Sequence, residues 1–528
     1  MERFSAKATS SSFVTPSQTS AFSHSPEVLP QDEYNATLIA NVHPAEWENP
    51  EPASRYNLVV IGAGTAGLVT AAGAVGLGAK VALVERHLMG GDCLNVGCVP
   101  SKCIIRSSRV LGDLATAAHF GVRVPAGTEV DFPAVMARMR RLRARMSHHD
   151  SARRFHEQLG VDVFLGEGHF AGPDVVEVGG KTLHFRRAII ATGARAVHPP
   201  IPGLAEAGFL TNETVFSLTE QPQRLAVIGG GPLGCELAQA FQRLGSKVTI
   251  VEMERQFLPR EDPQAAAVLL AAFQQEGLSV KLNTTLKKVT SSGKDKYLHL
   301  DSGGNEEILA VDAILVGVGR AANVEGLNLE AVGVTYDKKR GVVVNERLQT
   351  TNPRIYAAGD ICLDYKFTHA ADAAARVVIQ NALFFGRKKL STLTIPWCTY
   401  TDPEIAHVGM YEHEAEKQGS DVTTFTIPRR EVDRAIADGE EEGFVKIHVK
   451  KGTDQILGAT IVARHAGEML NELTLAMTAK IGLGTLSAVI HPYPTQAEAI
   501  RKAADAYNRT RLTPLVKKLF NSWLTWTR

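Results

Sequence analysis

The chain has 528 residues, and its 57 basic and 56 acidic side chains give a formal net charge of +1. This length is too great for one hydrophobic core, so we expect several domains. Because basic and acidic side chains nearly balance, the net charge gives no indication of a nucleic-acid partner. No apolar run approaches the ~18 residues of a membrane-spanning helix. Six cysteines are few for a secreted, disulfide-stabilised protein and favour a reducing compartment such as the cytoplasm.

Residues 1–54 are predicted to be a flexible extension. The stretch SAKATSSSFVTPSQTSAFSHSP is rich in Ser and Thr, and no acidic residue occurs between Glu2 and Glu27. This composition is typical of disordered leaders and also of organellar transit peptides, and it lacks the apolar segment of a secretory signal. A plain extension and an organellar address are therefore both open interpretations.

The first strong pattern is YNLVVIGAGTAGLVTAAGAVGLGAKVALVERH, residues 56–87. It predicts a buried strand, a glycine turn, an Ala- and Gly-rich helix and a second strand. Gly62, Gly64 and Gly67 form a G-x-G-x-x-G fingerprint, and Glu85 ends the second strand 23 residues after Gly62. The glycines let the backbone approach a pyrophosphate, and the carboxylate can bind ribose hydroxyls. We therefore expect a Rossmann-like module that binds a dinucleotide.

The same pattern returns 167 residues later, in RLAVIGGGPLGCELAQAFQRLGSKVTIVEMER, residues 224–255. Its glycines and its acid are Gly229, Gly231, Gly234 and Glu252. A repeat at this distance indicates a second whole module and a second dinucleotide. The carboxylate of Glu252 would accept ribose hydroxyls and repel a 2′-phosphate, which favours NADH over NADPH, although Arg255 complicates this choice.

Shorter patterns divide the rest of the chain. RAIIATGARAVHPPIPG and DAILVGVGRAAN each predict a strand that ends in a glycine turn, and alternating strands and helices follow residue 391. We predict a first dinucleotide-binding domain in two parts (55–203 and 323–390), a second one (204–322), an α+β domain without a fingerprint (391–512) and an amphipathic tail (513–528).

The stretch GGDCLNVGCVPSK, residues 90–102, holds Cys93 and Cys98. The four residues between them form a loop that can bring the two Cα atoms within the ~4.4–6.8 Å that a disulfide needs. Pro100 suits the first turn of a helix, which places Cys98 at a helix N-terminus, where the thiol pKa is lowered. A zinc site would require two further ligands at suitable spacing, so we favour a redox disulfide and predict no metal ligands.

In chain order, the two fingerprints, the cysteine motif, ATGA, YAAGD and the ending HPYPTQAE resemble the flavoprotein pyridine nucleotide–disulfide oxidoreductases over roughly residues 55–512. The mercuric reductase-like members look nearest, and dihydrolipoamide dehydrogenase and glutathione reductase are also similar. The resemblance implies an α/β fold with an FAD-binding and an NAD(P)-binding Rossmann-like module and an α+β dimerisation domain. It also implies that electrons pass from NADH or NADPH through FAD and the cysteine pair to a small-molecule acceptor.

The resemblance implies roles at the cysteine motif. Cys98 would face the flavin, and Cys93 would exchange with the substrate. Lys102 would touch the flavin and pair with Glu236 of the second module.

The resemblance also implies further cofactor contacts. Asp360, at a strand end, would bind the ribityl chain of the flavin. The helix that begins near His369 would point its N-terminus at the flavin ring. The other implied contacts are Gly91, Thr192 and Gly193 for FAD and Gly319 for NAD(P).

The ending HPYPTQAE bears on the subgroup. In disulfide-reducing members a His five residues before a Glu acts with it as general acid–base, whereas here Tyr493 stands five residues before Glu498, and His491 stands seven before it. A tyrosine with a pKa near 10 cannot readily manage the protons of a thiol leaving group. Tyrosine at this position resembles mercuric reductase. The family resemblance also implies a homodimer in which Tyr493 and Glu498 complete the site of the other subunit. A packing role for Tyr493 at the subunit interface is the alternative.

The mercuric reductase pattern is incomplete, because the chain has no cysteine after Cys398 and none before Cys93. Its tail, RLTPLVKKLFNSWLTWTR, has apolar residues at helical spacing. We expect this tail to pack on the dimer, with contact to a membrane surface or a partner as the alternative.

Two other features receive structural interpretations. Cys103 lies about 140° round the helix from Cys98 and is predicted to be a small buried hydrophobic residue, as are Cys235, Cys362 and Cys398. The basic stretch MARMRRLRARMSHHDSARR (136–154) is predicted to be an amphipathic helix with a solvated arginine face rather than a nucleic-acid arm.

We therefore predict an FAD-dependent enzyme that passes electrons from NADH or NADPH through Cys93–Cys98 to a soft, thiol-reactive acceptor, such as Hg(II) or another small oxidant. Two alternatives are a dihydrolipoamide dehydrogenase-like activity on dithiols and a redox-sensing or membrane- or partner-binding flavoprotein with little turnover.

Overall fold

The first dinucleotide-binding unit is built on a seven-stranded mixed sheet with the order β3-β2-β1-β6-β5-β4, in which β18 also pairs with β6. The computed structural model describes residues 26–528. Strand β1 pairs in parallel with both β2 and β6, and its apolar residues are buried on both faces of the sheet. The strands are β1 (Tyr56–Ile61), β2 (Val81–Glu85), β3 (Asp162–Leu165), β4 (Gly168–Gly172), β5 (Val175–Val178), β6 (Lys181–Ile190) and β18 (Ile355–Ala357).

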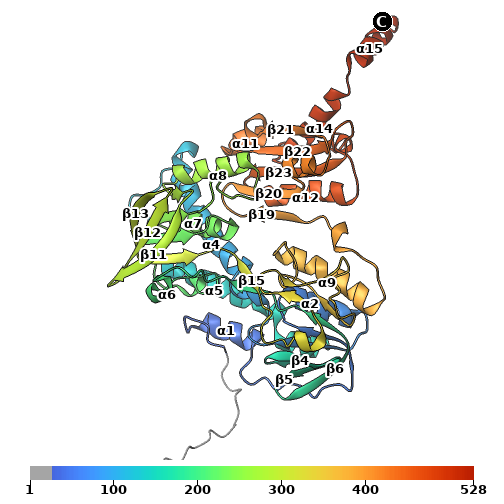
Figure 1. Ribbon diagram of the computed structural model, residues 1–528. Helices are drawn as coiled ribbons and strands as arrows, with labels where there is room; N and C mark the ends of the chain where they lie inside the picture. Colours follow the sequence, from blue (N-terminus) through green and yellow to red (C-terminus); the bar gives the residue numbers. More distant parts are fainter. Residues whose placement is uncertain (1–25) are drawn as a thin grey trace, which may run out of the picture.

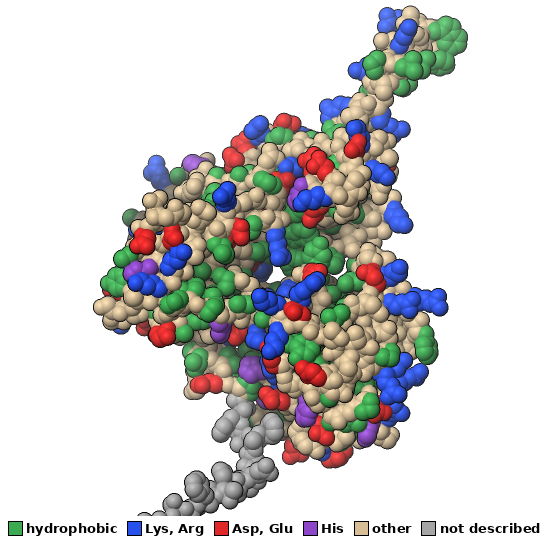
Figure 2. Space-filling model, viewed as in Figure 1, with side chains coloured by type: hydrophobic (Ala, Val, Ile, Leu, Met, Phe, Trp, Pro, Cys, Tyr) green, Lys and Arg blue, Asp and Glu red, His purple; other side chains and the backbone are tan. Residues whose placement is uncertain are grey.

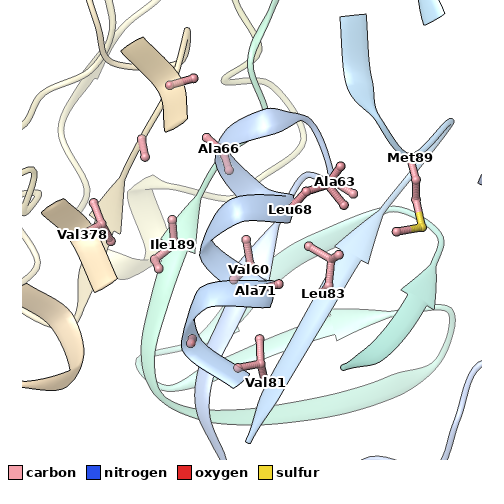
Figure 3. Close-up of a cluster of buried hydrophobic side chains, with 14 of the residues drawn as sticks. Val60, Ala63, Ala66, Leu68, Ala71, Val81, Leu83, Met89, Ile189 and Val378 are labelled. Carbon is pink, nitrogen blue, oxygen red and sulfur yellow. The ribbon is translucent and has the colours of Figure 1, made fainter. Parts of the chain in front are cut away.

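Helices α2 (Thr65–Gly76) and α9 (Thr368–Leu383) pack on one face of this sheet. The small residues of α2 let it lie close to the strands, with Val60, Leu83 and Ile189 beneath it and Val378 of α9 beside it (Figure 3). A Cβ on Gly73 of α2 would lie 2.7 Å from the side chain of Ile379, so this glycine sets the distance between the two helices.

The chain leaves the first unit and later returns to it. Strand β18 pairs in parallel with β6, with Ile355 opposite Ala188 and Ala357 opposite Ile190. The first unit is therefore assembled from two separate chain segments, with the second unit inserted between them. The domain boundaries at residues 203, 322, 390 and 512 stay predictions.

The second unit repeats the parallel arrangement in a four-stranded sheet of order β10-β9-β8-β14, beside a three-stranded antiparallel sheet of order β11-β12-β13. A two-stranded ribbon, β7–β15, lies between the units, and the short ribbon β16–β17 follows it. The strands are β7 (Ala194–Ala196), β8 (Arg224–Ile228), β9 (Lys247–Val251), β10 (Ser279–Lys281), β11 (Thr285–Ser292), β12 (Asp295–Ser302), β13 (Asn305–Val311), β14 (Ala313–Val316), β15 (Arg320–Ala322), β16 (Tyr336–Asp337) and β17 (Gly341–Val342). The helices are α6 (Leu204–Ala207), α7 (Pro232–Arg243) and α8 (Pro263–Gln275).

The C-terminal unit is a five-stranded antiparallel sheet of order β19-β20-β23-β22-β21 with helices packed against it (Figure 1). Its strands are β19 (Pro396–Thr399), β20 (Glu404–Gly409), β21 (Val422–Pro428), β22 (Phe444–Lys450) and β23 (Ile456–Ala463). Its helices are α10 (Glu412–Lys417), α11 (Asp433–Asp438), α12 (Ala466–Thr478), α13 (Leu483–Leu486) and α14 (Glu498–Thr510).

Three helices of the first chain segment surround the cysteine motif: α3 (Gly91–Asn95), α4 (Cys98–Thr116) and α5 (Phe132–Ser147). Ile104 of α4 and Met136 of α5 are fully buried in one apolar cluster with Phe241 of α7. The cysteine motif therefore lies where the first unit meets the second.

The expectation of a flexible extension over residues 1–54 is wrong for its C-terminal part. Helix α1 (Glu33–Val42) begins at the N-cap Asp32, and its Leu38 and Val42 are fully buried in the core of the first unit. The partner surface of α1 lies on α5, about a hundred residues further along the chain, so no local pattern indicated it. Residues 1–25, which include most of the Ser- and Thr-rich stretch, lie outside the described residues.

The expectation of a solvated arginine face on the basic stretch is also wrong at two positions of α5. Arg140 and Arg143 are buried. Arg140 Nε lies 2.5 Å from Asp32 Oδ2, and Arg143 donates to the Asn95 carbonyl at 2.6 Å and to Asn35 Oδ1 at 2.7 Å. Burial lowers the pKa of Arg143 to about 10, which leaves it charged at neutral pH. These arginines join α1 to α5 and, through Asn95, to the cysteine motif.

The last helix, α15 (Pro514–Trp526), projects away from the body of the molecule (Figure 1). None of its residues is buried. Within residues 26–528, no helix combines the length and the hydropathy needed to cross a membrane.

Candidate redox site

The two cysteines of the motif stand on either side of a tight turn between α3 and α4. Cys93 lies in α3, and Cys98 is the first residue of α4, as the sequence predicts. Gly97 makes the turn feasible, because a Cβ there would lie 2.7 Å from the Asp92 carbonyl oxygen and 3.4 Å from the Cys93 Cα. Both cysteines are free thiols in this structure and share a hydrogen bond.

The two thiols differ in acidity. The pKa of Cys98 is lowered to about 6, chiefly by the hydrogen bond from Cys93, with further help from Thr368 and the positive charge of Lys102. The pKa of Cys93 is raised by the same hydrogen bond and by burial. The position of Cys98 at a helix N-terminus favours its thiolate as well. Cys98 is therefore the more acidic thiol of the pair.

Helix α9 also directs its N-terminus at Cys98. Thr368, the first residue of α9, places its Oγ1 3.3 Å from Cys98 Sγ. No side chain caps this helix N-terminus, so its backbone N–H groups remain available to an anionic group. His369 lies in the first turn, where it was expected, and its Nε2 lies 2.6 Å from the Pro396 carbonyl oxygen.

Lys102 and Glu236 form the ion pair that the resemblance implies. Lys102 Nζ lies 2.7 Å from Glu236 Oε2, and Glu236 is buried. The other carboxylate oxygen accepts the Tyr400 backbone N–H at 2.9 Å, and the Tyr400 ring lies 4.6 Å from Lys102 Nζ. Burial alone would lower the pKa of Lys102, but the negative charges of Glu236 and Cys98 outweigh it and raise that pKa. Tyr400 thus holds both members of the pair, and no pattern in the sequence pointed to it.

A second ionic bridge ties the cysteine loop to β18. Arg320 of β15 donates to Asp92, the residue before Cys93, and lies 3.5 Å from Asp360. Arg320 also donates to the Ala194 carbonyl at 2.6 Å. Burial raises the pKa of Asp360, and the charges of Arg320 and Lys366 oppose that rise. Sequence reasoning placed Asp360 at a strand end but missed Arg320 and Asp92.

The first fingerprint forms a cradle for a pyrophosphate. Gly62 has φ of +103°, and a Cβ there would collide with the Ala191 carbonyl, while a Cβ on Gly67 would collide with the Gly62 carbonyl. Glu85 Oε2 accepts the Ala63 N–H at 2.6 Å, and Oε1 accepts the His87 N–H at 2.8 Å. Burial raises the pKa of Glu85, and these N–H groups counteract the rise.

The neighbouring segments close over this cradle. A Cβ on Gly91 would lie 2.7 Å from the Gly64 Cα, so the cysteine loop crosses directly over the fingerprint. Thr192 and Gly193 form the turn after β6, where Thr192 Oγ1 donates to the Asn323 carbonyl at 2.9 Å and Gly193 has φ of +68°.

The second fingerprint has the same internal geometry. Gly229 has φ of +102°, and its Cβ would lie 2.6 Å from the Gly317 carbonyl oxygen; a Cβ on Gly234 would collide with the Gly229 carbonyl. Glu252 accepts the Gly230 N–H at 2.7 Å and the Glu254 N–H at 2.9 Å. A Cβ on Gly231 or on Gly319 would meet no atom within 4 Å, so this cradle is open.

These contacts fit two bound dinucleotides. Each module presents a glycine-lined approach to a helix N-terminus and a buried carboxylate at the end of its second strand. The cysteine pair and the uncapped end of α9 lie beside the first of the two modules. Within residues 26–528, no group of three or more His, Cys, Asp or Glu residues is arranged to hold a metal ion.

Tyr493 and Glu498 lie in the C-terminal unit, and the contacts within residues 26–528 do not bring them to the cysteine pair of their own chain. Tyr493 is 72% exposed, and its hydroxyl donates to Asp433 at 3.0 Å, which raises its pKa. Glu498 Oε1 accepts from Arg501 at 3.0 Å, while its buried Oε2 has no partner among the described residues. His491, the nearby histidine, has both ring nitrogens engaged, with the Val489 carbonyl and Glu472.

The sequence matches two family descriptions along most of its length. Residues 56–375 match "Pyridine nucleotide-disulphide oxidoreductase", and residues 395–504 match the dimerisation domain of the same family. The chain belongs to the pyridine nucleotide–disulphide oxidoreductase family. It is therefore an FAD-dependent oxidoreductase that uses NAD(P)H, and the dimerisation domain supports a homodimer.

Similar proteins come from two named groups. The chain is 35% identical over 454 residues to a mercuric reductase of Staphylococcus aureus, which covers 86% of this chain and 83% of that protein. It is 36% identical over 460 residues to a dihydrolipoyl dehydrogenase of Thermus scotoductus, which covers 86% of this chain and 98% of that protein.

Solved structures share the fold. The Cu(II) complex of the HOCl-induced flavoprotein disulfide reductase RclA from Escherichia coli has a TM-score of 0.77 at 27% identity, covering 86% of this chain and all of that one. LpdA from Mycobacterium tuberculosis also has a TM-score of 0.77 at 27% identity, covering 85% of this chain and 99% of that one. The predicted combination of an α/β fold, two dinucleotide modules and a dimerisation domain is confirmed.

Proposed function

We propose that this protein passes electrons from NADH through FAD and the Cys93–Cys98 pair to a soft, thiol-reactive acceptor, in the manner of a mercuric reductase. The observation that carries the proposal is the asymmetry of the cysteine pair. Cys98 begins α4 and lies 3.3 Å from Thr368 Oγ1, whereas Cys93 lies in the short helix α3. In this setting the pKa of Cys98 is lowered to about 6 and the pKa of Cys93 is raised. A more acidic thiol paired with a less acidic one supports assigning the pair as the reduced form of a redox disulfide.

FAD, when bound, would accept a hydride from the nicotinamide and pass two electrons to the disulfide. Around it, the chain's own residues hold charge in place. Lys102, fixed between Glu236 and Tyr400, keeps a positive charge close to the Cys98 thiolate. Thr368 and the N-terminus of α9 stabilise the same thiolate. Closing the disulfide releases two electrons and the proton that Cys93 holds.

The proposed preference for NADH over NADPH is based on Glu252 of the second module. Glu252 is buried with its carboxylate held by two backbone N–H groups, at the place where a ribose 2′-position would lie. A fixed negative charge there accepts hydroxyls and repels a phosphate, which supports NADH.

The proposal of a soft metal ion as electron acceptor is based on the properties of Tyr493. Reduction of a disulfide substrate requires a base and acid for the leaving thiol. The raised pKa of Tyr493 makes it unsuited to that task, and His491 is engaged with Glu472. A soft metal ion requires no such group, because thiolates bind it directly. The similar mercuric reductases and the Cu(II) complex of RclA lend further support.

A second candidate is oxidation or reduction of a small dithiol, which the Thermus scotoductus dihydrolipoyl dehydrogenase favours by its 36% identity over nearly its full length. The two candidates differ in what they require at residue 493. We expect Tyr493→His to create dithiol activity that the unchanged protein lacks, and Tyr493→Phe to leave that activity absent.

The test is an acceptor panel with purified holoenzyme and NADH: Hg(II), Cu(II) and dihydrolipoamide or its disulfide. We expect metal-dependent NADH oxidation that Cys98→Ser abolishes, with little turnover of the lipoyl compounds. Rapid lipoyl turnover by the unchanged protein, without metal-dependent oxidation of NADH, would contradict the proposal and favour the second candidate.

A further inference from the structure

The C-terminal helix α15 is a separate helix whose start is defined by its own sequence. Thr513 is its N-cap and accepts the Val516 N–H, and Pro514 occupies the first turn. The helix projects from the C-terminal unit, and none of its residues is buried (Figure 1). The apolar side chains of the helix are therefore open to a partner outside this chain.

Helix α15 is divided lengthwise into an apolar and a polar half. At 100° per residue, its apolar side chains fall within a sector of about 180°. The apolar residues are Leu515, Val516, Leu519, Phe520, Trp523, Leu524 and Trp526. The polar ones are Lys517, Lys518, Asn521, Ser522 and Thr525. Leu515 is 68% exposed and Trp526 is 77% exposed, and Figure 2 shows green and blue side chains gathered on this projecting helix.

The segment also carries a concentrated positive charge. Residues 506–528 contain five basic side chains and no acidic one. Because the whole chain has a formal charge of +1 and this segment has +5, residues 1–505 together carry −4. Positive charge and two tryptophans on an exposed amphipathic helix are the features that bind anionic lipid surfaces.

A second copy of the chain is less suited than a lipid surface as the partner of α15, because the dimerisation domain exposes a separate apolar surface. Exposed apolar residues of the dimerisation domain lie outside α15, among them Ile490 at 94% exposure, Leu475 and Val489. These residues belong to the domain whose match supports the dimer, whereas α15 lies beyond the matched range. Lysines are also depleted from the cores of protein interfaces.

We propose that α15 is an interfacial helix that binds the surface of an anionic lipid bilayer, with its apolar half among the acyl chains and Lys517 and Lys518 at the headgroups. This inference is independent of the proposed function. It assigns to α15 the task of holding the oxidoreductase at a membrane surface, without spanning the membrane.

The experiment uses the full-length holoenzyme and two kinds of vesicle, phosphatidylcholine alone and phosphatidylcholine with phosphatidylserine. We expect co-sedimentation to rise about tenfold or more with phosphatidylserine and to weaken as salt is added. Removing residues 513–528 abolishes binding. NADH-dependent turnover of the soluble enzyme should stay unchanged, since within residues 26–528 no hydrogen bond or ion pair joins α15 to a residue of the redox site.

Matched substitutions separate the two halves of the helix. The double variant Phe520→Ser, Trp523→Ser should abolish vesicle binding, while Asn521→Ser with Ser522→Ala on the polar half should leave it unchanged. Lys517→Glu with Lys518→Glu removes the preference for phosphatidylserine.

Two results would overturn the inference. One is equal sedimentation of the full-length and truncated proteins with phosphatidylserine vesicles. The other is conversion of the dimer to a monomer by the truncation, measured by light scattering, which would show that a second copy covers the apolar half.

Discussion

The two dinucleotide modules of this chain share one internal geometry and differ in what covers them. In each, the buried acid accepts a backbone N–H 22 residues before it and another two residues after it, at Glu85 and at Glu252. Their first glycines adopt φ angles of +103° and +102°. The motif is thus a complete local structure that folds in the same way twice.

The surroundings of the two modules are unlike. The cysteine loop crosses the first fingerprint at Gly64, and α1 is hydrogen-bonded to the same edge, where the Met89 N–H donates to the Val42 carbonyl. At the second fingerprint, no described atom lies within 4 Å of a Cβ placed on Gly231, so no loop covers it there. Since a covered ligand dissociates slowly and an open site exchanges, the first module suits a resident cofactor and the second suits a co-substrate.

The largest effect is expected at the loop that only the first module possesses. Cys98→Ser removes the thiolate, so turnover with any acceptor that needs the dithiol falls by at least about a thousandfold, while FAD stays bound. Cys103→Ala on the same helix is the matched control and should keep turnover within about threefold, because Cys103 is buried away from the pair. Steady-state rates and the flavin absorbance per chain measure both outcomes.

Matched substitutions at the middle glycine of each fingerprint, Gly64 and Gly231, test whether the first module binds FAD and the second binds NADH. A Cβ on Gly64 would lie 3.8 Å from the Gly91 Cα, and one on Gly231 would meet nothing, so the fold tolerates either alanine. Each Cβ would enter the approach to the pyrophosphate. Gly64→Ala should lower FAD affinity, and Gly231→Ala should raise the KM for NADH, each by about ten- to a hundredfold.

The absorbance of bound FAD and the KM for NADH are measured for both variants. Loss of FAD from Gly231→Ala, or an unchanged KM for NADH in that variant, would break the assignment of the two modules.

A smaller effect is expected for the charge at the end of the second module's second strand. Glu252→Gln keeps the shape of the side chain and removes the repulsion of a 2′-phosphate. The ratio of kcat/KM for NADH to that for NADPH should therefore fall about five- to tenfold. Glu85→Gln, the matching change in the first module, should leave this ratio unchanged. A wild-type protein that prefers NADPH would contradict the role given to Glu252.

The smallest effect concerns the acidity of Cys98. Its thiolate is lost as pH falls through about 6, so alkylation of the NADH-reduced protein should slow about tenfold for each pH unit below that value. Lys102→Gln removes a positive charge that favours the thiolate and should shift the midpoint upward by about half a unit. The pH profile of the alkylation rate measures both, and a midpoint near that of a free thiol would contradict the asymmetry of the pair.

Much of the fold could be predicted because its features are local. The glycine fingerprints, their acids and the start of a helix at Cys98 each lie within about 30 residues of continuous sequence, where spacing alone fixes the geometry. The Lys102–Glu236 pair spans 134 residues and came only with the family resemblance.

The missed features all depend on contacts between distant segments. Helix α1 is held by α5, Arg320 bridges Asp92 and Asp360, and Tyr400 reaches Lys102 from the C-terminal unit. Burial of Arg140 and Arg143 likewise depends on Asp32 and Asn35 more than a hundred residues earlier. A single sequence carries no spacing that relates such residues.

A count of thiols before and after anaerobic reduction by NADH tests most directly whether Cys93 and Cys98 store electrons. The chain has six cysteines, so we expect four titratable thiols in the denatured oxidised protein and six after reduction, a gain of two that is absent from Cys98→Ser. The same number of thiols before and after NADH in the FAD-loaded protein would contradict storage of electrons in Cys93 and Cys98.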